Sequence, residues 1–106
     1  MADFEYVLVL TTVPADQDAD ALAKTLVEER LAACVNVLAP MRSVYRWKGE
    51  VETAAERQLV IKTTAANVPA LEKRVKELHP YEVPEFLVVA ADSGSNAYLE
   101  WITANC

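Results

Sequence analysis

The order of strand-like and helix-like segments is the feature that most constrains the fold of this chain. Residues 5–12, EYVLVLTT, form a nearly unbroken aliphatic and β-branched run, which predicts a strand buried on both faces. Pro14 ends this run. Within residues 13–33, several aspartates precede Leu22, Leu26 and other apolar residues at helical spacing. Negative charge suits the first turn of a helix, so the second segment is predicted to be helical.

The middle of the chain, residues 34–64, is predicted to form one long hairpin. Residues 34–50 are rich in strand-forming residues, and Pro40 among them implies an edge position, a bulge or a bend. Gly49, one of only two glycines, separates the two arms, so the turn is expected near Lys48–Gly49. The second arm, residues 51–64, contains the weak strand sequence TAAE. Its start is therefore expected to be frayed or supported by a partner.

The last third of the chain repeats the alternation of helix and strand. Residues 67–79 have apolar residues at helical spacing, with Pro69 in the first turn, where a missing N–H costs nothing. Residues 85–92, EFLVVAAD, predict another strand. A turn at Gly94 then leads into a short C-terminal helix within residues 93–106.

The resulting order β-α-β-β-α-β, followed by a terminal helix, predicts an α+β fold of the ferredoxin-like type in a single domain, residues 1–106. Two right-handed crossovers place both long helices on one face of an antiparallel sheet. The first strand and the second hairpin arm would lie at the centre. The other sheet face and the sheet edges would lack cover, which predicts an oligomer.

The composition limits which classes of molecule this protein is expected to bind and in which compartment it is expected to lie. Ten Lys and Arg residues stand against 16 Asp and Glu, for a net charge of −6, which disfavours nucleic acid and anionic membranes as partners. No apolar run approaches the roughly 18 residues of a membrane-spanning helix. The start MADFEY is acidic, unlike a signal peptide, so a cytoplasmic location is expected. The only cysteines, Cys34 and Cys106, are expected to be reduced thiols, with a disulfide as the alternative.

His79, the only histidine, opens the segment HPYEVPE and is a candidate metal ligand. A neutral imidazole binds Cu(II) or Zn(II). The alternative is a structural role at the end of the second long helix, where an imidazolium stabilises the helix dipole and free carbonyl groups. Cys34 is a second candidate ligand, and its alternative role is that of a small buried apolar residue.

The rest of HPYEVPE combines stiffness with oxygen-bearing side chains. Pro80 and Pro84 fix two backbone torsions and hold their neighbours extended, whether or not an ion binds. Tyr81, Glu82 and Glu85 either supply oxygen ligands or line a pocket between subunits. The structural alternative is a rigid connection in which Tyr81 is packed and Glu82 is solvated.

Four residues of the hairpin arms form a further candidate group. Tyr45 and Trp47 are amphipathic side chains of the kind enriched at interfaces. Lys62, within the apolar run LVIKTT, is expected to need a carboxylate partner, and Glu56 is the candidate. The group forms either a polar intersubunit pocket for an anion or a small molecule, or an interface with an internal ion pair. A Lys62–Glu56 acid–base pair in an enzyme is a third hypothesis, although CxxC, HExxH and glycine-rich phosphate motifs are absent from the sequence.

Four motifs in this order, RLAACVNVL, YRWKGEVE, IKTT and HPYEVPE, give the chain a resemblance to a known family. The sequence resembles the CutA family of divalent-cation tolerance proteins over nearly its whole length. This resemblance implies a homotrimer of ferredoxin-like subunits, an association with copper or other divalent metal ions, and no enzymatic activity.

The resemblance also bears on the metal site. Some relatives carry a cysteine near the end of the first strand and two adjacent histidines before PY. Here Thr11 and Leu78 stand at two of these positions and only His79 remains, which implies weak metal binding. The family also resembles trimeric PII signalling proteins, so the alternative function is a small-molecule sensor with ligand clefts between subunits. The acidic charge and the missing glycine-rich loop weigh against nucleotides as ligands.

Overall fold

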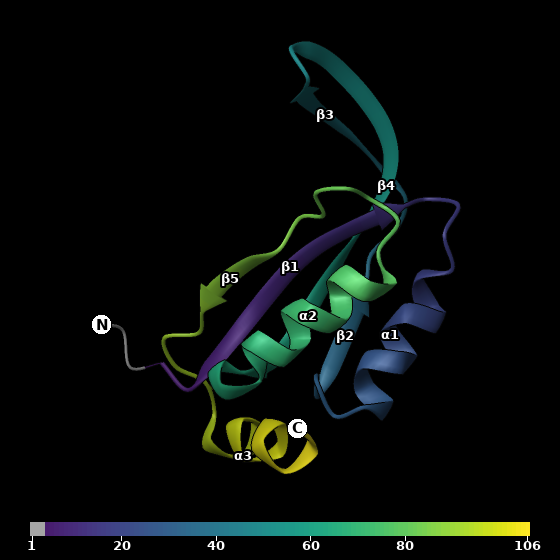
Figure 1. Cartoon of the computed structure of the whole chain (residues 1–106). Coiled ribbons are helices and arrows are strands. Elements are labelled where there is room, and N and C mark those ends of the chain that lie inside the picture. The colour runs from purple at the N-terminus through teal and green to yellow at the C-terminus, as the bar shows by residue number, and fades with distance from the viewer. Residues whose placement is uncertain (1–3) are drawn as a thin grey trace.

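The structure, a computed structural model, describes residues 4–106, so the first three residues of the acidic N-terminal segment lie outside it. Five strands and three α-helices follow the predicted order (Figure 1). Their bounds are β1 Tyr6–Pro14, α1 Ala19–Glu28, β2 Cys34–Val37, β3 Met41–Trp47, β4 Glu50–Thr64, α2 Val68–Leu78, β5 Leu87–Ala90 and α3 Asn96–Asn105. A short 3-10 turn, Ala65–Asn67, precedes α2.

The sheet confirms the predicted ferredoxin-like arrangement. Its strand order is β2-β4-β1-β5 with antiparallel pairs throughout, and β3 pairs with the other end of β4. The central pair, β1 and β4, is in register from Tyr6 opposite Thr64 to Pro14 opposite Glu56. Helices α1 and α2 lie on the same face of this sheet, and α3 lies at the end away from the hairpin (Figure 1).

Local capping sets where the helices begin. Helix α1 starts at Ala19 because the Asp18 carboxylate accepts a hydrogen bond from the Ala21 N–H at 3.0 Å. Residues Pro14–Gln17 form a turn, with the Gln17 N–H donating to the Pro14 carbonyl. Pro69 occupies the first turn of α2, as the sequence predicts.

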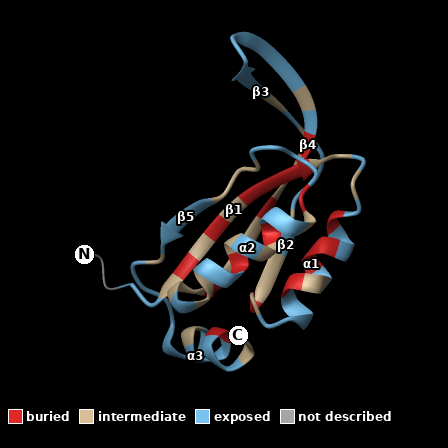
Figure 2. Cartoon of the chain, viewed as in Figure 1, coloured by how far each residue is buried: buried red, intermediate tan, exposed pale blue. Residues whose placement is uncertain are grey.

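The core lies between the sheet and the two long helices (Figure 2). Its largest fully buried aliphatic side chains are Val9, Val13, Leu26, Leu59, Ile61, Leu71 and Val75. Along β1, buried residues alternate with the half-buried Leu8 and Leu10. The prediction that this strand is buried on both faces is therefore wrong for the single chain, because the two long helices cover only one face.

The hairpin differs from the prediction in two places. Its first arm consists of two strands, β2 and β3, separated at residues 38–40, where Pro40 breaks the pattern as expected. The expected fraying at the start of the second arm is wrong. β4 runs unbroken from Glu50, since β3 pairs with it from Trp47 opposite Glu50 to Met41 opposite Glu56. These ladder hydrogen bonds override the weak strand propensity of TAAE.

The hairpin turn projects away from the body of the molecule (Figure 1). Lys48 and Gly49 have φ angles of 51° and 83°, the left-handed conformation of a tight hairpin turn. Most residues of this projection are exposed (Figure 2). The turn lies where the sequence predicts it.

Candidate functional site

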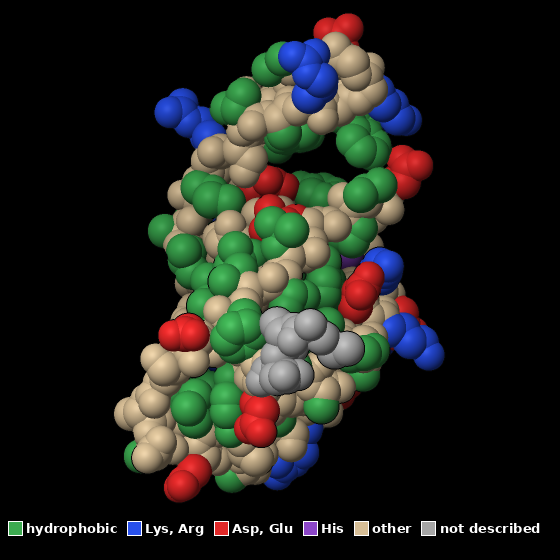
Figure 3. All heavy atoms as spheres, turned by 90° about the vertical axis from the view of Figure 1, so that its left-hand side faces the viewer, with side chains coloured by type: hydrophobic (Ala, Val, Ile, Leu, Met, Phe, Trp, Pro, Cys, Tyr) green, Lys and Arg blue, Asp and Glu red, His purple; other side chains and the backbone are tan. Residues whose placement is uncertain are grey.

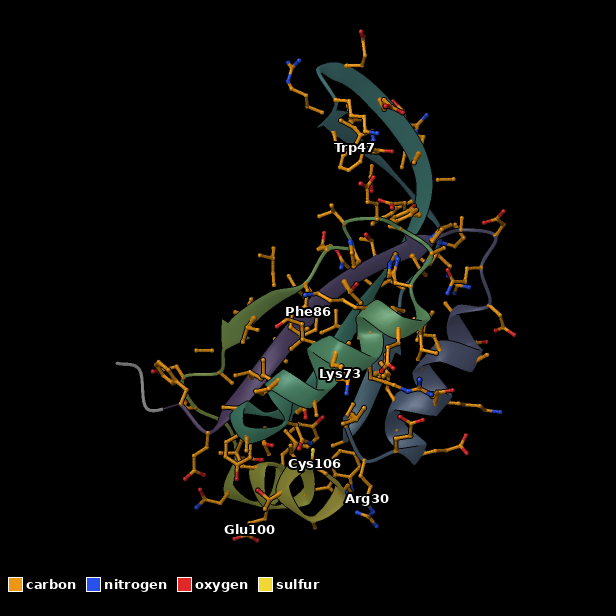
Figure 4. The ribbon with its side chains drawn as sticks, in the orientation of Figure 1. Arg30, Trp47, Lys73, Phe86, Glu100 and Cys106 are labelled. Atoms are coloured by element: carbon orange, nitrogen blue, oxygen red, sulfur yellow. The ribbon has the colours of Figure 1, made fainter. Side chains whose placement is uncertain are left out.

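A pocket of about 660 Å³ lies between the hairpin and the HPYEVPE connection that joins α2 to β5. Figure 3 shows the hollow, with acidic and hydrophobic side chains around it. Five of the candidate residues proposed from sequence meet here, namely Tyr45, Trp47, Glu56, Tyr81 and Glu82. The other lining residues are Thr12, Ser43, Val44, Pro80, Val83, Pro84 and Glu85. Trp47 lies beneath the tip of the hairpin, on the side facing the rest of the sheet (Figure 4).

A hydrogen bond between Glu56 and Tyr81 links the two walls of the pocket. Glu56 is only 6% exposed, and its Oε2 accepts a hydrogen bond from the Tyr81 hydroxyl at 2.8 Å. Burial of the phenol, and then this hydrogen bond, raise the pKa of Tyr81 from 10.0 to about 12. Tyr81 therefore remains a neutral donor at physiological pH.

A second contact anchors Glu85 beside the same pocket. The Gln58 amide donates one hydrogen bond to the Glu85 carboxylate at 3.0 Å and another to the Thr11 carbonyl at 2.6 Å. Gln58 lies on β4 and Thr11 on β1, so this amide ties both central strands to the connection. Glu82 is exposed. The described lining residues include three glutamates and no lysine or arginine.

His79 has a structural role in this connection. It is 8% exposed, and its Nε2 lies 2.6 Å from the Thr12 carbonyl oxygen, so Nε2 carries the proton and donates. Its Nδ1 accepts a hydrogen bond from the Tyr81 N–H at 3.1 Å. Both ring nitrogens are therefore occupied, and a metal ion would have to displace one of these bonds. Neither bond goes to a carbonyl of α2, unlike the helix-end role considered from sequence.

Cys34 lies too far from His79 to share an ion with it in one chain. Cys34 pairs with Lys62 of β4, whereas Thr12, the partner of His79, pairs with Gln58. Four residues along a strand span about 13 Å. Within residues 4–106, no group of three or more His, Cys, Asp or Glu residues is arranged to hold a metal ion.

The predicted pairing of Lys62 with Glu56 is wrong within one chain. Both lie on β4, six residues or about 20 Å apart. The Lys62 ammonium instead lies 5.8 Å from the centroid of the Tyr98 ring in α3. Lys62 is thus remote from the pocket, and an acid–base pair of these two residues in one subunit is excluded.

Three contributors to this region were not predicted from the sequence. Ser43 lines the pocket, the Gln58 amide donates a hydrogen bond to Glu85, and the Thr12 carbonyl accepts one from His79. Only the register between β1 and β4 brings Thr12 opposite Gln58. The sequence carries no local signal for these contacts.

Comparisons with known proteins agree with the fold and with the arrangement of the motifs. Residues 7–105 match the family described as CutA1 divalent ion tolerance protein. The divalent-cation tolerance protein CutA of Thermus thermophilus is 49% identical over 98 residues, which cover 92% of this chain and 95% of the relative. The protein of the same name from Pectobacterium atrosepticum is 42% identical over 99 residues, covering 93% and 90%.

A solved structure gives the same result in three dimensions. The divalent cation tolerance protein (Cut A1) from Thermus thermophilus superposes with a TM-score of 0.91 at 48% identity. The superposition covers 94% of this chain and 97% of that one. At this identity and coverage the match shows common descent as well as a common fold. The chain belongs to the CutA1 divalent ion tolerance protein family.

Proposed function

We propose that this protein contributes to divalent-cation tolerance as a cytoplasmic homotrimer that binds copper or another divalent ion weakly and catalyses no reaction. Family membership is the observation that carries the proposal, because relatives with 49% and 42% identity are named divalent-cation tolerance proteins. None of the helices within residues 4–106 is long and apolar enough to cross a membrane.

Exposed apolar surface supports the trimer. Within residues 4–106, β5 pairs only with β1, and its Leu87, Val88 and Val89 are 58%, 47% and 44% exposed. On the hairpin, Val44 and Val51 are 69% and 64% exposed. Figure 3 shows hydrophobic side chains gathered over the side of the molecule that faces the viewer. A sheet edge without charges and exposed valines on a projecting hairpin are features that subunit association covers.

Light scattering tests the trimer. Three copies of the 11.7 kDa chain should scatter as one particle at micromolar concentration, and Tm should rise with protein concentration. Trp47→Ala should weaken assembly by about 3 kcal/mol per site, the scale of aromatic truncations. A monomer mass together with a concentration-independent Tm would refute the trimer.

The geometry of the candidate ligands supports weak metal binding. His79 binds a metal ion only after one of its two hydrogen bonds is broken, and Cys34 lies at a separate place on the sheet. Tight transition-metal sites combine three or four ligands. A divalent ion here would therefore draw on His79 or Cys34 together with carboxylates such as Glu82, or on ligands from a neighbouring subunit.

Copper titration in a non-chelating buffer tests this part of the proposal. Copper should bind weakly to the wild type, and its affinity should fall in His79→Gln or in Cys34→Ser. The glutamine in His79→Gln keeps a hydrogen-bond donor for the Thr12 carbonyl. Unchanged binding in His79→Gln would remove His79 from the ligand set. Nanomolar affinity that vanishes only in Cys34→Ser would show that the site is centred on the thiol.

The 660 Å³ pocket favours a second candidate function, small-molecule sensing of the PII type. Its three glutamates disfavour anionic ligands. Calorimetry with ATP, ADP and 2-oxoglutarate tests this alternative, and micromolar binding of any of them would support it.

A further inference from the structure

We infer that the pocket between the hairpin and the HPYEVPE connection binds a small aliphatic organic cation, whose protonated amine is held by aromatic rings and carboxylates. This goes beyond divalent-ion tolerance and does not depend on metal binding. Three features of the pocket carry it: the sign of its charge, a buried carboxylate without a cationic partner, and its aromatic walls.

The pocket carries charge of one sign. Glu56, Glu82 and Glu85 line it, and the described lining residues contain no lysine or arginine. The only side-chain donors to these carboxylates among residues 4–106 are the neutral Tyr81 hydroxyl and Gln58 amide. A concave site with one sign of charge concentrates ligands of the opposite sign.

Glu56 is the strongest of the three indications. Glu56 as a residue is only 6% exposed, yet the ion pairs among the described residues, Arg74–Glu29 and Lys76–Glu72, do not include it. Buried carboxylates are normally paired with a cation because burial removes their hydration. The Tyr81 hydroxyl satisfies one Glu56 oxygen at 2.8 Å, and among the described residues of one chain no cation compensates the charge. A bound ammonium would supply the missing positive charge.

The aromatic walls favour an organic cation over a bare metal ion. Tyr45, Trp47 and Tyr81 all line the pocket. Aromatic faces attract an ammonium group electrostatically and also contact the aliphatic carbon atoms attached to it. The chain's own Lys48 ammonium lies 5.7 Å from the centroid of the Trp47 ring, within the range of cation–π attraction, so this indole is accessible to an ammonium group.

The volume of the pocket and the hydrogen-bond donors that its carboxylates require limit the class of ligand. A volume of about 660 Å³ is in the range of small-molecule sites. Carboxylates accept N–H hydrogen bonds, which a protonated primary amine donates and a quaternary ammonium does not. Three carboxylates spread over one pocket suit an aliphatic chain with more than one amine.

Calorimetry with 1,4-diaminobutane, compared with the neutral 1,4-butanediol at constant ionic strength, tests the inference on the assembled protein. The diamine should bind with a dissociation constant of about 0.1–1 mM, and the diol should show no binding at about 10 mM. A Trp101→Phe background leaves Trp47 as the only tryptophan, so its fluorescence reports on the pocket when light scattering shows that the oligomeric state is unchanged.

Matched variants separate the pocket from general electrostatic attraction. Glu82→Gln should weaken diamine binding about five-fold, and Tyr45→Leu by a similar factor. Glu100→Gln removes the same charge from exposed α3, remote from the pocket, and should change binding less than about two-fold (Figure 4).

Four results would overturn the inference. In the wild type, these are equal binding of the diol and the diamine, or no binding of the diamine at about 10 mM. Among the variants, it is a loss of diamine affinity in Glu100→Gln equal to that in Glu82→Gln. The fourth is displacement of the diamine by an equimolar amount of Mg²⁺. The last result would show an unspecific acidic surface. Retained copper binding in Glu82→Gln would leave the metal proposal intact whichever of these results is found.

Discussion

Replacing His79 with alanine should destabilise the folded protein by about 3 kcal/mol, and this should hold without any metal ion. The imidazole is 8% exposed and connects the end of α2 to β1. Its Nε2–H donates to the Thr12 carbonyl at 2.6 Å, and its Nδ1 accepts from the Tyr81 N–H at 3.1 Å. Alanine removes both contacts at once.

The size of this loss follows from the two backbone groups that lose their hydrogen-bond partner when the imidazole is removed. Thr12 is 7% exposed, so its carbonyl would be left buried without a partner, which costs about 2 kcal/mol. The Tyr81 amide is only partly buried and loses about 1 kcal/mol, because water reaches it more easily. The two hydrogen bonds together account for the predicted loss of about 3 kcal/mol. The cavity left by the ring adds a further packing loss, so this figure is a lower bound.

Urea unfolding at one fixed protein concentration, with a chelator present, measures this loss. His79→Gln should recover part of it, since the glutamine amide can donate to the same carbonyl. Lys73→Ala, on the exposed face of α2, is the matched control and should change stability by less than about 0.5 kcal/mol (Figure 4).

Two outcomes would contradict this reasoning. A loss below about 1 kcal/mol for His79→Ala would mean that the two hydrogen bonds contribute little to folding. A loss that appears only when divalent ions are present would mean that His79 stabilises the protein through a metal ion.

Three further predictions concern other parts of the fold. Because the pKa of Tyr81 is raised from 10.0 to about 12, its neutral form stabilises the fold fully below pH 10, and this contribution should disappear as pH rises through about 12. Urea unfolding from pH 8 upwards should show that loss in the wild type and not in Tyr81→Phe. Ile61→Ala, at a fully buried core position, should cost about 3–4 kcal/mol in the same assay, and a cost below 1 kcal/mol would be inconsistent with the observed core. Gly49→Ala should cost about 1 kcal/mol through its φ of 83° alone, because nothing lies within 4 Å of the added Cβ, and unchanged thermal stability would contradict that strain.

The secondary structure was largely readable from the sequence because its signals are local. The apolar run of β1, the helical spacing in α1 and α2, Pro69 and the Gly49 turn each act within a few residues, and each appears where predicted. The order of elements then leaves few topologies, which is why the ferredoxin-like sheet was also predictable. The TAAE segment was misjudged because pairing with β3, a non-local contact, decides its structure.

The pocket was predictable only in part. The proximity of Tyr81, Glu82 and Glu85 follows from the stiff HPYEVPE segment, and Tyr45 and Trp47 share a hairpin arm. That these two groups face each other depends on how the hairpin leaves the sheet. No periodicity in the sequence encodes that direction.

The sequence by itself determined the elements, their order, the acidic charge and the residue types available for binding. Only the tertiary structure decided which of those residues meet. The register of β4 separates Lys62 from Glu56 and brings Glu56 to Tyr81, and the fold commits both nitrogens of His79 to the backbone. Side-chain identity is a local property, whereas hydrogen-bond partners are set by strand register and chain reversal. Those depend on contacts between residues far apart in the sequence.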